Sequence, residues 1–143
     1  MLSIENESGL NLDPGVLEKI IDTVVEMERD IDLLICDNEK IRELNAKYRG
    51  KDSITDVLSF PLDEADLLPG MPLGSIVISA EMAAEKADEL GHRVEEELSL
   101  LFIHGLLHLM GYDHETDGGE MREIERDIVR KLSLPESLIV RNE

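Results

Sequence analysis

The sequence predicts an α+β fold: a single domain over residues 1–143, with a mixed sheet of about four strands and about five helices. Strand-like and helix-like stretches follow one another irregularly, unlike the regular alternation of a doubly wound parallel sheet. The helix predicted over Arg93–Met110 is apolar almost all round from Leu98 onward, which is typical of a helix buried on most sides. A length of 143 residues also suits one domain with a real core.

The first half of the chain is expected to hold three strands and two helices. In order these are a strand over 2–7, a helix over 13–27, a strand over 31–36, a helix over 37–48 and a strand over 57–60. The first helix opens on Asp13-Pro14, because an N-cap Asp accepts backbone hydrogen bonds and Pro suits the first turn. Ile41, Leu44 and Tyr48 recur at helical spacing, so we expect them on the inner side of the second helix.

The second half is expected to hold one strand and three helices. In order we expect a loop over 61–73, a strand over 74–79, and helices over 79–90, 93–110 and 117–132. The loop contains several prolines and acids and is predicted to be mobile. Ser79 is a suitable N-cap for the first of these helices, and Gly91 a suitable end. The helix over 93–110 is the central one and carries the histidines discussed below.

The chain is strongly acidic, with a formal net charge of −19 and a pI near 4.4. This balance opposes nonspecific binding to nucleic acid, whose affinity comes largely from Lys and Arg neutralising phosphates. Solvated helix faces account most simply for the acids, although an acidic surface also favours basic partners. Any RNA contact must then be concentrated in a local basic patch. The densest cationic spot before the histidines is Arg49-Gly50-Lys51.

Two observations predict a cytoplasmic protein without a membrane segment. No signal peptide is visible, and the longest apolar stretch, Leu98–Met110, is too short to span a bilayer. A single cysteine, Cys36, excludes an intramolecular disulfide framework, as is usual in a reducing compartment.

Three of the four histidines fall within the eleven residues from His104 to His114. His104 and His108 are four apart and therefore share one helix face. Gly111 follows, and a glycine just past a helix turns the chain, so that His114 could swing back toward the other two. Two histidines at this spacing also occur by chance, but the third is harder to attribute to chance. Three imidazoles at one point predict a zinc ion with its fourth position open to water.

The same spacing matches the signature of metzincin metalloproteases. In those enzymes a Glu follows the first His and serves as general base, whereas this chain has Gly105 there. Peptide hydrolysis by the usual route therefore loses its base, and a protease is disfavoured. Gly105 has two readings: close packing against a neighbouring element, or clearance beside the metal for a bulky ligand such as a phosphodiester.

The run from His104 to His114 resembles the signature of the YbeY family, metal-dependent endoribonucleases that mature ribosomal RNA in bacteria. A second block, Leu44–Asp52 followed by Thr55–Pro61, is similar to the same family. A third, Gly74–Ser79, resembles its Gly-Asp-Ile-x-Ile-Ser segment, with Ser75 in place of the Asp. The order and spacing of the blocks agree over nearly the whole chain.

The resemblance implies that His104, His108 and His114 are zinc ligands and that Arg49 acts near the metal. A metal supplies Lewis acidity and can lower the pKa of bound water toward about 7. A guanidinium can hold two phosphate oxygens with a forked pair of hydrogen bonds. The plain alternative for Arg49 is a cation that favours the helix dipole. Lys51 is a second candidate phosphate contact, or a solvated loop lysine.

The resemblance also implies a single-strand-specific endoribonuclease acting at the 3′ end of small-subunit ribosomal RNA and in ribosome quality control. The expected partners are single-stranded ribosomal RNA, the small ribosomal subunit with its basic proteins, and an assembly GTPase. The alternative is a non-catalytic assembly factor whose metal is structural, with Cys36, an acid or His92 as fourth ligand. The nucleophile stays open between water and the RNA 2′-hydroxyl.

Alternative roles remain open for several residues near the proposed site. Asp52 and Asp56 are expected either as turn and cap residues or as groups that orient Arg49. Asp113 is expected either as a turn acid or as a partner of a ligand imidazole. Met121 is expected in the helix core rather than under the metal, and His92 at the surface.

Overall fold

The computed structural model describes residues 2–10, 12–25, 30–61, 73–113 and 115–135. The elements in these ranges are β1 (Leu2–Asn6), α1 (Pro14–Val24), β2 (Ile31–Cys36), α2 (Asn38–Arg49), β3 (Val57–Pro61), β4 (Gly74–Ser79), α3 (Ala80–Leu90), α4 (Val94–Leu109) and α5 (Glu120–Lys131). They confirm the predicted α+β class. In the same ranges, no helix is both long and apolar enough to cross a bilayer.

One sheet organises the fold, with strand order β1-β2-β4-β3. β1, β2 and β4 are parallel to one another, whereas β3 runs antiparallel along β4 at the edge. The sheet is therefore mixed, as predicted.

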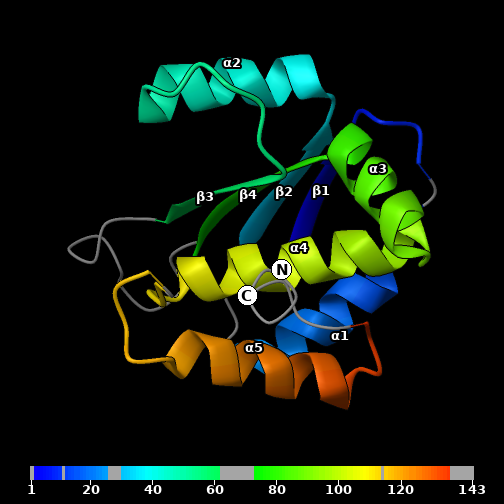
Figure 1. Cartoon of the computed structure of the whole chain (residues 1–143), viewed down its shortest axis with the longest axis vertical. Coiled ribbons are helices and arrows are strands. Elements are labelled where there is room, and N and C mark those ends of the chain that lie inside the picture. The colour runs from blue at the N-terminus through cyan, green and yellow to red at the C-terminus, as the bar shows by residue number, and fades with distance from the viewer. Residues whose placement is uncertain (1, 11, 26–29, 62–72, 114, 136–143) are drawn as a thin grey trace.

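The helices lie on both faces of the sheet (Figure 1). α2 lies over part of one face, while α4 crosses the other, with α1 and α5 packed beyond it. Strand side chains alternate accordingly: Leu33 and Ile76 join the main core on the α4 side, and Val77 joins a smaller cluster on the α2 side. Most residues of α4 are buried, which confirms the expected central helix.

Most helix ends follow their local capping residues. The carboxylate of Asp13 accepts a hydrogen bond from Gly15 N, and the Ser79 hydroxyl accepts one from Met82 N. Gly91 ends α3 in the left-handed conformation, at φ 76°. These contacts are the N-caps and C-cap that the sequence predicts.

Two boundaries differ from expectation by about three residues, and the others by no more than one. α1 ends at Val24 instead of near residue 27, and α5 begins at Glu120 instead of 117. The Asp117 carboxylate accepts hydrogen bonds from Gly119 N and Met121 N, so this acid precedes the helix and satisfies its first donors. The loop expected over 61–73 lies almost entirely in 62–72, outside the described residues, and its predicted mobility stays untested.

Tyr48 lies on the inner side of α2, as predicted, and packs against Phe60 of β3, although it is still 60% exposed. One predicted side-chain position is wrong. His92 is not a surface residue: its side chain is only 11% exposed, and its Nε2 lies 2.8 Å from Oε1 of the buried Glu97. The start of α4 folds against the end of α3 and buries this pair.

Candidate functional site

The site is built on two histidines of α4. His104 and His108 stand one turn apart on the same face, with ring centroids 4.8 Å apart. Their Nε2 atoms are 3.2 Å apart. His104 is 8% exposed, so its ring is held by the surrounding core, while His108 is half-buried.

Each of these rings has an oxygen acceptor at Nδ1. His108 Nδ1 lies 2.9 Å from the Tyr112 carbonyl oxygen, and His104 Nδ1 lies 2.8 Å from Glu125 Oε2. A carbonyl oxygen can only accept, so His108 carries its proton on Nδ1. An ionised Glu125 imposes the same tautomer on His104. Both rings then present an Nε2 lone pair toward the same point.

This arrangement fits a metal ion. Two lone pairs 3.2 Å apart repel each other unless a proton or a metal ion lies between them. Tetrahedral zinc with Zn–N bonds of about 2.0–2.1 Å separates two ligand nitrogens by roughly 3.3 Å. The Nε2 separation therefore suits zinc, and the carboxylate and carbonyl at Nδ1 are the partners that metal-bound imidazoles usually have.

The turn after α4 supplies one of those partners. Gly111 adopts φ 97°, a left-handed conformation that favours glycine, and Tyr112 N donates to Leu107 O. The chain therefore folds back and brings the Tyr112 carbonyl to His108. His114 lies outside the described residues, so its predicted role as third ligand stays a prediction. Within the described ranges, no group of three or more potential ligands is assembled.

A cavity of about 490 Å³ opens over the histidine pair. Its lining comprises His104, His108, Arg49, Asp56, Val57, Ser59, Pro61, Gly111, Tyr112, Asp113 and Glu115. Arg49 reaches it from the last turn of α2, on the other side of the edge strand β3. The structure thus places this arginine in one pocket with the histidines. Lys51 is exposed and does not line the pocket.

The acids near Arg49 form hydrogen bonds with other residues. Asp52 binds Arg42 at 2.7 Å, and this hydrogen-bonded ion pair holds the pKa of the Asp52 carboxyl below its usual range. The reading in which Asp52 orients Arg49 is therefore wrong. Asp56 Oδ1 accepts a hydrogen bond from Val57 N, and Asp113 Oδ1 accepts one from Glu115 N. These contacts favour the turn and cap readings of both residues.

Gly105 packs α4 against the sheet. A Cβ added there would lie 3.0 Å from Ile76 Cγ2, 3.1 Å from Ser59 Oγ and 3.3 Å from Val57 Cγ2. The Ser59 hydroxyl also donates to the Gly105 carbonyl, at 3.0 Å. Side chains of β3 and β4 occupy the space that a larger residue would need, which favours the packing reading over clearance for a ligand.

Sequence reasoning missed Glu125. This carboxylate is 1% exposed and comes from α5, 21 residues after His104. One signal was available: Met121, Glu125 and Ile128 share the inner face of α5 at helical spacing. A carboxylate on an apolar helix face requires a buried partner, and here that partner is His104.

The other candidate ligands lie elsewhere. Cys36 packs with Ile41 and Val77 on the α2 side of the sheet, and burial raises the pKa of its thiol to about 11. His92 is engaged with Glu97 near the start of α4. Neither of them lines the histidine pocket.

Comparisons with known proteins show the family to which the chain belongs. A family model described as Endoribonuclease YbeY matches residues 4–133. Endoribonuclease YbeY of Nautilia profundicola is 53% identical over 143 residues, covering 100% of this chain and 99% of the relative. The protein of that name from Sulfurovum sp. is 51% identical over 146 residues, covering 100% and 98%. A solution structure from Thermotoga maritima aligns with a TM-score of 0.62 and 32% identity, covering 92% of this chain and 89% of that one.

Fold, pocket and relatives together define the chain as a member of an endoribonuclease family. It belongs to the YbeY family, and the resemblance of its three sequence blocks is thereby confirmed.

Proposed function

We propose that the chain is a zinc-dependent endoribonuclease, specific for single strands, which matures the 3′ end of small-subunit ribosomal RNA and serves ribosome quality control. One observation carries this proposal: the Nε2 atoms of His104 and His108 lie 3.2 Å apart, and both residues line one pocket with Arg49. Membership of an endoribonuclease family makes RNA the natural substrate.

His104 and His108 hold the zinc ion through Nε2, with His114 as the proposed third ligand. The bound ion supplies Lewis acidity beside the scissile phosphodiester. Glu125 and the Tyr112 carbonyl keep both rings in the ligating tautomer and orientation.

Arg49 has a separate task. Cleavage of a phosphodiester builds negative charge on its oxygens, and a guanidinium can hold two of them with a forked pair of hydrogen bonds. Arg49 lines the same cavity as the histidines, so a phosphate can contact both. The pocket is large enough for a phosphate with its sugar.

The acidic surface shapes the choice of partners. A net charge of −19 repels RNA at long range, and it attracts basic proteins. The small ribosomal subunit, with its basic proteins, is therefore a proposed partner, through which the enzyme reaches its RNA. The family resemblance adds an assembly GTPase as a second proposed partner.

The proposal is tested by cleavage of single-stranded and duplex RNA with the zinc-loaded protein. His108→Ala is expected to lose zinc, measured as metal content, together with cleavage. Arg49→Ala is expected to keep zinc and to lower kcat/KM by about 10- to 150-fold, the equivalent of one charged hydrogen-bonded contact.

Arg42→Ala is the matched control, because Arg42 is another arginine of α2 but pairs with Asp52 outside the pocket. It should cleave like the wild type. Equal cleavage by all variants would indicate a contaminating nuclease. Failure of the wild type to cleave any RNA would refute the proposal.

A further inference from the structure

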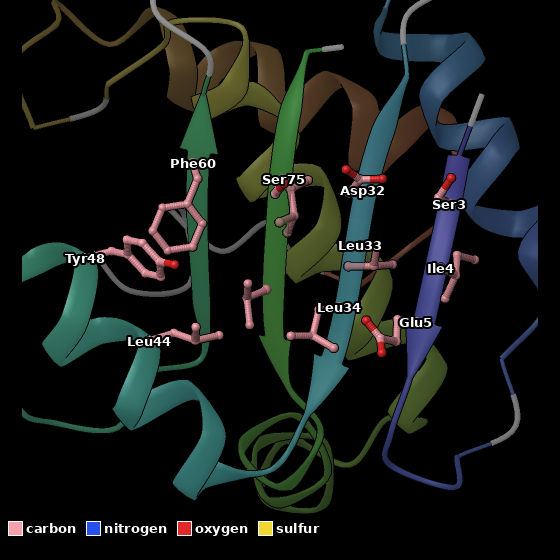
Figure 2. Close-up of a pocket in the computed structure, with 12 residues that line it drawn as sticks. Ser3, Ile4, Glu5, Asp32, Leu33, Leu34, Leu44, Tyr48, Phe60 and Ser75 are labelled. Atoms are coloured by element: carbon pink, nitrogen blue, oxygen red, sulfur yellow. The ribbon is translucent and has the colours of Figure 1, made fainter.

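A second hollow lies on the opposite face of the sheet (Figure 2). It is a groove of about 610 Å³ that runs from β1 across β2 and β4 to the end of α2. Its floor includes Leu34 and Val77. Tyr48 and Phe60 form one end, and exposed acids, Asp32 and Glu5, stand at the other. The proposed nuclease chemistry uses none of these side chains.

Tyr48 presents an aromatic ring at the end of the groove. It is 60% exposed, although Phe102 is buried and the other two aromatic residues are half-buried. Phe60 packs against it at an interplanar angle of 66°, with ring centroids 5.6 Å apart, and so supports the ring from one side. Most of the Tyr48 surface remains available to a ligand, and an exposed ring with a firm support suits stacking.

This end of the groove adjoins the histidine pocket. Tyr48 and Phe60 line the groove, and the residues that follow each of them, Arg49 and Pro61, line the pocket. Among the described residues, the edge strand β3 lies between the two hollows, because its alternate residues line one or the other. A strand of RNA whose phosphate contacts Arg49 can therefore pass the edge of β3 and place a neighbouring base beside Tyr48.

Charge favours this path for RNA. Lys47, Arg49 and Lys51 fall within five residues without an acid among them, in a chain of net charge −19. The Lys47 ammonium lies 5.1 Å from the centre of the Tyr48 ring. Phosphates are therefore attracted at the Tyr48 end and repelled by Asp32 and Glu5 at the far end. A neutral base can enter the groove while the RNA backbone stays at the cationic end.

We propose that the Tyr48 end of the groove is a subsite that stacks one nucleobase of the RNA, next to the phosphate held by Arg49. The inference rests on the proposed nuclease function and extends it. A base in a duplex is paired and stacked within its helix, whereas an unpaired base can turn out onto an aromatic ring. Stacking on Tyr48 therefore supplies a physical reason for preferring single strands.

The test combines protein variants with abasic substrates. Tyr48→Leu keeps an apolar side chain against Phe60 but removes the ring, and Tyr48→Phe keeps the ring. Single-stranded RNAs carry one abasic position at successive sites around the cleaved bond. For the wild type, one flanking abasic position should raise KM by about 5- to 150-fold, the range for loss of one stacked base.

Tyr48→Leu should raise KM on intact RNA by the same factor, leave kcat nearly unchanged, and show no further rise at that abasic position. It should also lose most of the preference for single strands. Tyr48→Phe should resemble the wild type. Leu90→Ala, at another exposed large apolar residue, on α3, is the matched control and should have no effect. In a His108→Ala background, 2-aminopurine at the same position should be quenched on binding, and Tyr48→Leu should abolish the quenching.

The outcomes separate the two proposals. If the wild type cleaves RNA and Tyr48→Leu shows the full abasic penalty, the nuclease stands and the stacking subsite is wrong. If the wild type cleaves no RNA, both fall. If Tyr48→Leu loses binding of a Lys- and Leu-rich peptide while RNA kinetics are unchanged, the groove is a protein-docking surface and the inference is overturned.

Discussion

Glu125 and the Tyr112 carbonyl act on the two histidines of α4 in the same way. Each accepts from Nδ1 and so leaves Nε2 to face the pocket. The Glu125 contact is buried, so its strength is little reduced by solvent. A single residue of α5 thus orients His104 on α4.

Replacing Glu125 tests this role. Glu125→Gln keeps the shape but removes the charge that favours Nδ1–H on His104, so zinc affinity is expected to fall about 10- to 100-fold. Chelator competition measures this affinity directly. Glu123→Gln, at an exposed carboxylate one half-turn away, is the control and should bind zinc like the wild type. Equal affinity in both variants would show that Glu125 does not position the ligand.

At the scale of elements, the contact of α4 with the sheet sets the position of the histidines. Gly105 lets the helix approach β3 and β4 closely, and the Ser59 hydroxyl binds the helix backbone at that point. Both histidines lie within one turn of this contact. The geometry of the site therefore depends on how closely α4 and the sheet pack.

Enlarging Gly105 should loosen that packing. Overpacking a core costs about 1–3 kcal/mol, whereas Gly→Ala within a helix gains about 1 kcal/mol in propensity. Gly105→Ala is therefore expected to lower the free energy of unfolding by about 1 kcal/mol, measured by urea denaturation. Gly118→Ala is the control, since a Cβ there would meet only the end of the Glu120 side chain, at 3.4 Å. A gain in stability for Gly105→Ala would show that the space beside the helix is open.

At the scale of the whole molecule, charge is distributed unevenly. The chain carries 33 acidic and 14 basic residues, and three of those basic residues lie at the end of α2 beside both hollows. RNA should therefore be bound through few phosphates, close to the site. The rest of the surface is left to basic partners.

This distribution predicts a weak salt dependence. If Lys47, Arg49 and Lys51 each contact one phosphate, log Kd for single-stranded RNA should change with log salt with a slope of about 2, because each contact contributes about 0.7. Lys47→Ala should lower the slope by about 0.7, and Lys86→Ala on α3 should leave it unchanged. Fluorescence titration at several salt concentrations measures both. A slope above about 4 would show that cations outside this cluster bind the RNA.

Local patterns were enough to predict the class of fold and most of its elements. Caps such as Asp13 and Ser79, the left-handed Gly91 and the apolar periodicity act over one or two turns, so the sequence shows them directly. The spacing of His104 and His108 is local in the same sense. The three sequence blocks also sufficed to indicate the family.

The sequence by itself therefore determined the secondary-structure elements, the spacing of the two histidines on one helix face, and the family. Only the tertiary structure decided that Arg49 of α2 shares a pocket with α4, that Glu125 of α5 fixes His104, and that Tyr48 is exposed beside that pocket. The physical reason is the range of the interactions. Turns and helices follow from neighbours three or four residues apart, whereas these contacts depend on how whole elements pack.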